Sequence, residues 1–377
     1  MAPIDSTQPR TDDDSPYQAL IGVGGIGSGL SFALEGNHDL GRNESRPARL
    51  VPAHDYCKLH IITHYVAALL HDSTAESPFQ ILPVGKVGND DEGRRLLREM
   101  NGVGLDTRHV DIVEGKPTLL SICFQYPDQS GGNITTIDSA AAALMSDDID
   151  RLVPQLAAFG SRLIVLAVPE VPLAVRQHLL KLATTHGAFR AASFTSAEIL
   201  EALRLGILSL VDLLAVNEDE AAALMGHALD VTDPHRLLED LRATFTASQP
   251  EINVVVSAGK RGVFAFAGDR WSHFPALPVQ AVSTAGAGDA LLAGILVGLI
   301  AGAPLSRPES SVADGLGRTL GSAIELGILL ASFSVTSLHT IHPEANGESL
   351  LDFASELGLT FQGRLGQILT KDELLRT

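Results

Sequence analysis

The chain alternates short apolar runs with segments of helical periodicity over most of its length. Apolar runs rich in Val, Ile and Leu are typical of strands buried on both faces of a parallel sheet. They occupy residues 19–27, 81–87, 162–168, 211–217 and 252–259. Apolar positions three and four residues apart predict helices over residues 58–71, 90–104, 172–187, 218–226 and 289–302. The alternation predicts an α/β fold with a doubly wound, mostly parallel sheet.

One region departs from this alternation and predicts a small β-rich lid. Residues 118–126 and 133–138 have the pattern of a hairpin around the turn PDQSGG. We expect lid segments at about residues 30–55 and 108–140, which close over a substrate and exclude water. The remaining divisions are a disordered tail over 1–16, one domain over 17–345 and a partly helical C-terminal extension over 346–377.

Composition argues against several classes of partner. The 377 residues carry 27 basic and 45 acidic side chains, a net charge of −18, so neither nucleic acid nor an anionic membrane is an expected partner. Two cysteines, Cys57 and Cys123, cannot build a disulfide framework or a cysteine metal cluster. The N-terminal residues are polar and acidic and lack the apolar core of a signal peptide. Together these features predict a cytoplasmic protein.

The candidate chemistry is concentrated in the segment Ser283-Thr284-Ala285-Gly286-Ala287-Gly288-Asp289, which leads into an apolar helix. Small residues before a helix leave backbone N–H groups exposed, and the helix dipole strengthens their attraction for an anion. A carboxylate beside such an anion hole can accept a proton from a hydroxyl that attacks phosphorus. Asp289 is also suited to be an ordinary first-turn residue. Because the helix is apolar on all sides, we expect it to be buried and to begin at the carboxyl edge of the sheet, where α/β proteins bind ligands.

The stretch from Ser283 to Leu296 resembles the C-terminal signature of the ribokinase-like, PfkB-type carbohydrate kinases. Other segments resemble motifs of that family in the same order along the chain. They are GKVGNDDEG at 85–93, LDTRHV at 105–110, NEDE at 217–220 and SAGKRG at 257–262. The resemblance covers roughly residues 18–345 and implies a ribokinase-like fold.

The family resemblance implies a reaction. The γ-phosphoryl group of ATP would be transferred to a hydroxyl of a sugar or sugar-like acceptor, with Asp289 as general base. The backbone N–H groups of Gly286, Ala287 and Gly288 would form the anion hole and stabilise charge on the transferring phosphoryl group.

The resemblance also implies a cofactor side of the site. Asn217 and Glu220 would order Mg²⁺ through its water ligands, a role that suits oxygen donors. The phosphates and ribose of ATP would lie beside Ser257, Gly259 and Gly262. Relatives often pair through the lid, so a homodimer is a further expectation.

The acceptor side departs from the family pattern. The family's first strand is followed by an aspartate that grips sugar hydroxyls, whereas this chain has the glycine-rich stretch 25–29. The family's double-glycine signature is replaced by residues 53–60, where Asp55 and Lys58 are candidate acceptor contacts, as is Asn37 in the lid. The alternative interpretation makes Asp55 a helix N-cap and leaves Lys58 in solvent. The acceptor itself is not identified: a sugar, a sugar phosphate, a nucleoside and another alcohol remain open.

Ser283 stands where relatives have an acidic residue that helps to hold a monovalent cation. This replacement argues against activation by potassium. The sequence alone gives no further information on monovalent-cation dependence.

Two other functions fit parts of the sequence. Gly22, Gly24 and Gly27 match the spacing of the fingerprint of nicotinamide-dependent enzymes, but that fingerprint requires a long helix next. Residues 35–41 would break any such helix within about two turns. The missing sugar-gripping aspartate suggests instead a catalytically silent binding or regulatory protein, although such a protein has no need of Asp289.

Overall fold

A nine-stranded sheet lies at the centre of the computed structural model, which describes residues 15–70, 79–128, 131–226, 239, 252–267, 270–307 and 319–370. The strand order is β13-β12-β11-β10-β9-β8-β1-β4-β5, and the neighbours are parallel except at β11–β12 and β12–β13. The predicted α/β fold is confirmed. The strands are β1 Ala19–Val23, β4 Gln80–Gly88, β5 Val110–Val113, β8 Leu163–Ala167, β9 Phe189–Ala192, β10 Leu213–Asn217, β11 Asn253–Ser257, β12 Val263–Ala267 and β13 Arg270–Phe274.

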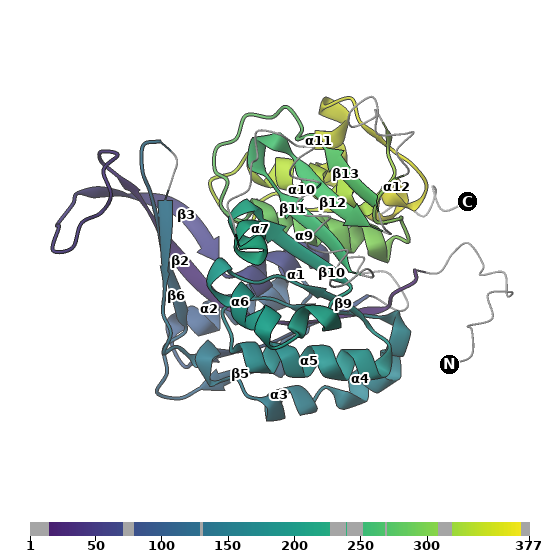
Figure 1. Ribbon diagram of the computed structural model, residues 1–377, viewed down its shortest axis with the longest axis horizontal. Coiled ribbons are helices and arrows are strands. Elements are labelled where there is room, and N and C mark those ends of the chain that lie inside the picture. Colours follow the sequence, from purple (N-terminus) through teal and green to yellow (C-terminus); the bar gives the residue numbers. More distant parts are fainter. Residues whose placement is uncertain are drawn as a thin grey trace, which may run out of the picture.

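Helices cover both faces of this sheet (Figure 1). Successive residues of a strand point to opposite faces. Leu20 of β1 belongs to the core formed with α1, α9 and α10, and Ile21 belongs to the core formed with α4 and α5. Two buried faces explain why these strands are continuously apolar in sequence. The helices are α1 Lys58–Leu70, α2 Asp91–Gly102, α3 Ser146–Asp150, α4 Val153–Phe159, α5 Leu173–His186, α6 Ser196–Arg204, α7 Glu218–Met225, α9 Ala287–Ile300, α10 Ala323–Ser334, α11 Gly347–Glu356 and α12 Arg364–Leu369.

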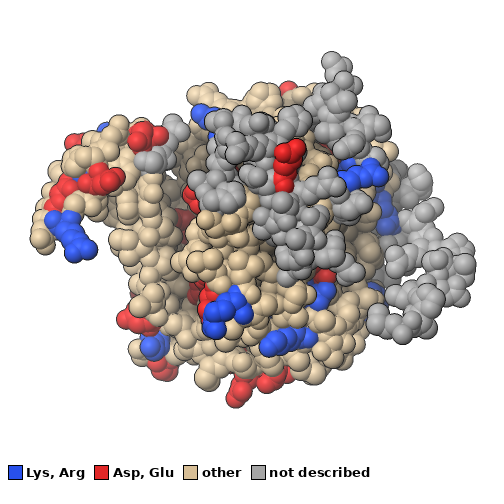
Figure 2. All heavy atoms as spheres, viewed as in Figure 1, with Lys and Arg blue, Asp and Glu red and all other residues tan. Residues whose placement is uncertain are grey.

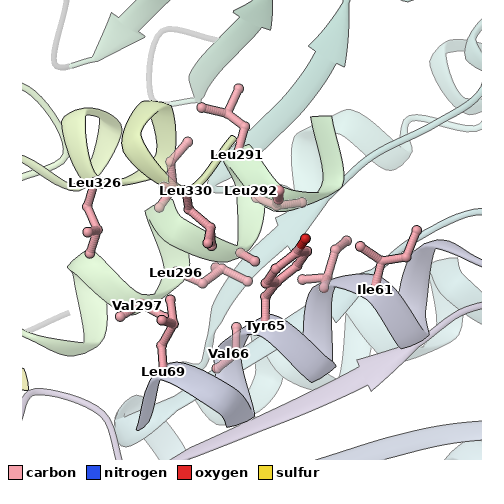
Figure 3. Packing of buried hydrophobic residues seen from close by; sticks show 14 of the residues in the cluster. Ile61, Tyr65, Val66, Leu69, Leu291, Leu292, Leu296, Val297, Leu326 and Leu330 are labelled. Atoms are coloured by element: carbon pink, nitrogen blue, oxygen red, sulfur yellow. The ribbon is translucent and has the colours of Figure 1, made fainter. Parts of the chain in front are cut away.

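Helix α9 is buried because α1 and α10 pack against it. A Cβ added to Gly294 would lie 2.6 Å from the Cα of Gly327, and one added to Gly298 would lie 2.5 Å from the Cα of Ala323, so the backbones of α9 and α10 are in contact. Figure 3 shows large side chains of α1 filling the space on another side of α9. The residues labelled there are Ile61, Tyr65, Val66, Leu69, Leu291, Leu292, Leu296, Val297, Leu326 and Leu330.

A second sheet projects from the domain as the lid (Figure 1). Its order is β3-β2-β6-β7, formed by β2 Gly27–Leu34, β3 Ala48–Tyr56, β6 Leu119–Gln125 and β7 Gly131–Thr135. β6 and β7 are antiparallel, so the predicted hairpin is confirmed. The predicted segment 108–140 was too wide, because β5 pairs with β4 in the central sheet. The short sequence Val110–Val113 gave no sign of which sheet it would join.

The two faces of the lid differ in polarity. The ladder aligns Leu30 with Ile122 and Ile134, and Phe32 with Leu50, which puts these apolar side chains on one face. The opposite face carries Gly29, Asp55, Ser121, Cys123 and Asn133. The polar face therefore includes Asp55, one of the predicted acceptor contacts.

Asp90 joins the lid to the domain. Its carboxylate accepts hydrogen bonds from the backbone N–H of Thr118 at 2.7 Å, from the Thr118 hydroxyl at 2.6 Å and from the Gly93 N–H at 2.8 Å. The same side chain thus caps α2 and holds the residue that precedes β6.

Both ends of the described chain pack on the domain. Ser15, at the end of the predicted tail, donates to the Ile300 carbonyl at 2.6 Å, while residues 1–14 lie outside the described part. In the C-terminal extension, Leu350, Ala354 and Leu365 are buried in the core that contains α1 and α9. β14 Thr319–Leu320 pairs in parallel with β15 Thr360–Phe361. Residues 371–377 lie outside the described part.

The described surface and helices bear on possible partners. On the face in Figure 2, lysine and arginine side chains lie singly or in small groups among other residues. Among the described residues, no helix combines the length and hydropathy needed to cross a bilayer.

Candidate active site

The site is organised by the turn that begins α9. Gly286 is the N-cap, with φ at 76°, a left-handed conformation that favours glycine. A Cβ on this residue would lie 2.9 Å from the Thr340 carbonyl oxygen. Both constraints require glycine here. The turn places Asp289 in the first helical turn, where 14% of its side chain is exposed.

The backbone N–H groups at the start of α9 form the candidate anion hole. The first N–H groups of an α-helix lack acceptors within the helix. The Ala287 N–H donates to the Thr284 carbonyl at 3.2 Å and closes the turn, so this donor is already engaged. Gly288 lies near the end of β11, since a Cβ on it would be 3.9 Å from the Ser257 hydroxyl. Gly286 and Gly288 are therefore the better candidates for binding an anion.

The predicted nucleotide-side residues meet at the carboxyl ends of β10 and β11. Asn217 and Ser257 are aligned in the strand register. Gly259 and Gly262 have φ angles of 54° and 90° and form the turn between β11 and β12. Arg261 in this turn forms an ion pair with Glu218 of α7. The structure thus brings the NEDE and SAGKRG segments together.

Asn217 and Glu220 also have a structural role. The Asn217 Oδ1 accepts from the Glu220 N–H at 2.8 Å, and the Glu220 Oε2 accepts from the Asn217 N–H at 2.9 Å. This capping box fixes the start of α7. Among the described residues, no group of three or more histidine, cysteine or carboxylate side chains is placed to hold a metal ion directly. The arrangement suits a cation held mainly by phosphates and water, with the capping box at its edge.

A chain of charged groups leads from Asp289 to the acceptor side. The Nζ of Lys58, the first residue of α1, lies 3.5 Å from Oδ1 of Asp289. The backbone N–H of Lys58 donates to Oε2 of Glu170 at 3.2 Å. Glu170 follows β8 and has φ at 76°, a strained conformation for a non-glycine residue of the kind that clusters at functional sites.

Asp55 lies against a glycine at the start of β2. Gly27 and Gly29 alternate in the first residues of this strand, and Gly25 lies two residues before it. A Cβ on Gly25 would lie 2.4 Å from a Glu170 carboxylate oxygen, and one on Gly29 would lie 2.2 Å from Oδ2 of Asp55. Two carboxylates from distant segments therefore occupy the space that side chains at Gly25 and Gly29 would fill. The Cys123 thiol donates to Oδ2 of Asp55 at 3.3 Å.

Burial governs the ionisation of these carboxylates. It raises the pKa of Asp289, and the neighbouring Lys58 opposes that rise. It raises the pKa of Glu170 to about 7, again against the effect of Lys58. It raises the pKa values of Asp55, whose side chain accepts from a thiol, and of Glu220. The site thus contains several carboxylates that are costly to ionise together.

A protein-family comparison decides the class of the protein. The model of the pfkB family of carbohydrate kinases matches residues 66–346, which include α9 and both nucleotide-side segments. The chain belongs to this family. A deoxyribokinase of Salmonella typhi is 28% identical over 261 residues, 69% of this chain and 77% of the relative. The protein is accordingly a phosphotransferase with an alcohol group as acceptor.

Solved structures show the same fold. A ribokinase from Giardia lamblia matches with a TM-score of 0.70 and 16% identity, over 89% of this chain and 99% of that chain. The Arabidopsis thaliana ribokinase complexed with ribose and ATP matches with a TM-score of 0.65 and 17% identity, over 90% of this chain and 99% of that chain. The ribokinase-like fold predicted from sequence is confirmed.

Several sequence interpretations need correction or addition for this pfkB family kinase. Gly27 is the first residue of strand β2 and no helix follows it directly, so the alternative of a nicotinamide-dependent enzyme is wrong. Asn37 is exposed in the hairpin between β2 and β3, and its Oδ1 accepts from the Asp128 N–H at 3.2 Å, so the structure does not bring it to Asp55 and Lys58. Glu170 was missed. Its signal was a lone carboxylate in the loop that follows a buried strand.

Proposed function

We propose that this pfkB family kinase transfers the γ-phosphoryl group of ATP to a hydroxyl of a sugar or sugar-like acceptor, with Asp289 as general base. The proposal rests on the position of Asp289, a mostly buried carboxylate in the first turn of α9, beside the turn of Gly286. The start of that helix offers both a proton acceptor and N–H donors for an anion.

The reaction can be written with these groups. Asp289 accepts the proton of the acceptor hydroxyl while the hydroxyl oxygen forms a bond to the γ-phosphorus. The bond from that phosphorus to the bridging oxygen breaks, and ADP leaves. The N–H groups of Gly286 and Gly288, with the helix dipole, stabilise charge on the transferring group. Such transfers depend mainly on positioning and on charge stabilisation.

The nucleotide side completes the proposal. Ser257, Gly259 and Gly262 would border the phosphates and ribose of ATP. Asn217 and Glu220 would orient water ligands of Mg²⁺, which would neutralise phosphate charge when bound.

The acceptor would bind between the lid and the start of α1. Asp55 takes the place of the missing aspartate, because its buried carboxylate lies against Gly29 of the lid strand and has acceptor capacity for sugar hydroxyls. Asn37 is left out of this set. The exposed Leu30, Leu50 and Ile134 on the other face of the lid would suit the expected homodimer.

The test is ADP release with ribose, deoxyribose, fructose, sugar phosphates and nucleosides as acceptors, comparing the parent with Asp289→Asn. We expect a loss of turnover on the order of 10²–10⁴-fold, the usual contribution of a general base. Asp91→Asn is the matched control, because Asp91 also lies in the first turn of a helix but its side chain is fully exposed.

Turnover by Asp289→Asn at the parent's rate would contradict the mechanism. If ATP raised the unfolding temperature of the parent but none of these acceptors released ADP, the catalytically silent binding protein would be the better interpretation.

A further inference from the structure

Lys58 combines contacts with the base and with the acceptor side, and the reaction as written leaves it without a role. We propose that Lys58 is a positioning residue: it is the counter-ion of Asp289 and holds that carboxylate oriented and ready to accept a proton. This inference rests on the proposed function, because it assigns a task within the same site.

The backbone geometry fixes the reach of Lys58. It is the first residue of α1, a helix held against α9 by the apolar contacts in Figure 3. Its N–H donates to Glu170, so the backbone at the start of the side chain is anchored. Tyr65, further along α1, donates to the Thr340 carbonyl, and Thr340 packs on Gly286. The two helix starts are therefore fixed relative to each other.

The contact leaves the base able to react. Nζ of Lys58 approaches Oδ1 of Asp289 at 3.5 Å, which is longer than the usual 2.7–2.9 Å of a charge-assisted hydrogen bond. The contact is made by Oδ1, so Oδ2 can face an acceptor hydroxyl. The Lys58 side chain is 32% exposed, which places the ammonium at the wall of the site and not deep in the core.

The surrounding charges explain why a counter-ion is needed. Asp289 has carboxylate neighbours on three other elements: Asp55 on β3, Glu170 after β8 and Glu220 on α7. Each would make ionisation of Asp289 harder. Burial raises the pKa of the Tyr65 phenol, so this group stays neutral and adds no further negative charge. Lys58 lowers the pKa values of Asp289, Glu170 and Glu220, and Asp289 in turn raises that of Lys58.

The first experiment is the pH profile of kcat/KM for ADP release by Lys58→Met, Lys58→Arg and the parent. Lys181→Met, on the exposed surface of α5, is the control. Without the counter-ion the base needs a higher pH to ionise. We expect the acidic limb of Lys58→Met to move upward by about one pH unit, with up to roughly tenfold less activity on that limb and recovery toward the parent at higher pH. Lys58→Arg should restore the position of that limb.

A uniform loss at every pH, with the acidic limb unmoved, would overturn the proposal and would indicate a structural or direct acceptor-binding role. Activity of Lys58→Met equal to the parent's at every pH would overturn it too.

The second experiment does not depend on turnover, so it separates this inference from the proposed function. Chemical unfolding at pH 7 is compared for the parent, Lys58→Met, Asp289→Asn and the double variant. A counter-ion pair predicts that Lys58→Met destabilises the parent more than it destabilises Asp289→Asn. Equal losses in both backgrounds would overturn the pairing. Failure of the proposed function would instead appear as undiminished turnover by Asp289→Asn.

Discussion

The two sides of the proposed active site are built in different ways. The catalytic and nucleotide side consists of backbone turns at the starts of α9 and α7 and at the end of β11, where glycine and capping residues set the geometry. The acceptor side consists of side chains from distant segments, with Asp55 lying over Gly29 of β2 and Glu170 over Gly25, just before that strand. In the proposed function, backbone turns present N–H groups to phosphate whatever the acceptor is, whereas side chains contact the acceptor. Substrate choice can therefore change on one side while the transfer machinery of the other is kept.

The largest effect is expected where the backbone is most constrained. Gly286→Ala would place a Cβ 2.9 Å from the Thr340 carbonyl oxygen in a left-handed conformation. The turn must then move, and with it the N–H groups of the anion hole. We expect kcat to fall by roughly 10²-fold or more, the scale of losing one such donor. The free energy of unfolding should fall by about 1–3 kcal/mol. Steady-state kinetics and urea unfolding measure the two effects.

Gly288→Ala is the matched control for stability. Its Cβ would meet only the Ser257 hydroxyl, at 3.9 Å, in a backbone that is already helical. Alanine is favoured over glycine in helices, so we expect no loss of unfolding free energy. Equal stability losses in the two variants would show that the left-handed turn is not the reason for the glycine.

A smaller and more selective effect is expected on the acceptor side. Asp55→Asn removes a charge that has little solvation, since the side chain is 7% exposed. If Asp55 accepts from acceptor hydroxyls, the KM for the acceptor should rise about 10-fold, the scale of one hydrogen bond to a charged group, while the KM for ATP stays the same. The unfolding free energy at pH 7 should not fall, because burial disfavours this carboxylate's charged form.

Asp39→Asn, in the exposed hairpin of the lid, is the control for this variant. If Asp55→Asn changed the KM values for ATP and acceptor equally, or changed neither, Asp55 would not be an acceptor contact. The residues of the acceptor side would then not act on acceptor binding alone.

The difference between contiguous backbone turns and side chains from distant segments also explains what could be predicted from the sequence. The helix that carries the proposed base could be predicted because its residues are contiguous: the predicted helix at 289–302 is α9 Ala287–Ile300, and Asp289 lies in its first turn. The periodicity of hydrophobic residues and the presence of turn residues are local signals, so strand β4 and helix α1 were also predicted to within one residue at each end.

Asp55 and Lys58 were named as candidates, but the contacts of the acceptor side could not be predicted because they join residues distant in sequence. Lys58 and Asp289 are 231 residues apart, and nothing local to either residue predicts that they meet. The alternative interpretation of Asp55 as a helix N-cap was wrong: Asp55 lies within β3, because pairing with Gly29 extends the strand. Residues 30–34 of β2 fall in the predicted lid segment 30–55, but no strand was predicted there, since the glycines of β2 hide the alternation that marks a half-buried strand.

The smallest effect that we expect is on the pH dependence of the free energy of unfolding. It concerns a buried histidine on the acceptor side that has no hydrogen-bond partner among the described residues. His60 of α1 is fully buried, and neither ring nitrogen has a hydrogen-bond partner among the described residues. Burial holds the pKa of His60 well below its usual range, and His64 and Arg95 lower it further. In the unfolded chain the same ring takes up a proton near pH 6.5. Below that pH the unfolded state binds more protons, so the stability contributed by neutral His60 is lost as the pH falls.

His60→Leu should therefore weaken the dependence of stability on acid. The parent's free energy of unfolding should fall by up to about 1.4 kcal/mol more than the variant's for each pH unit below 6.5. Burial raises the pKa of Glu170 to about 7, so protonation of Glu170 stabilises the folded protein as the pH falls below 7. This contribution is the same in the variant and the parent, so it cancels when the two are compared. Urea unfolding between pH 5 and pH 8 measures the difference, with His38→Leu as control because that side chain is 70% exposed. Parallel stability curves for His60→Leu and the parent would mean that His60 is protonated equally in the folded and unfolded states, and that this side of the site tolerates buried charge better than its contacts indicate.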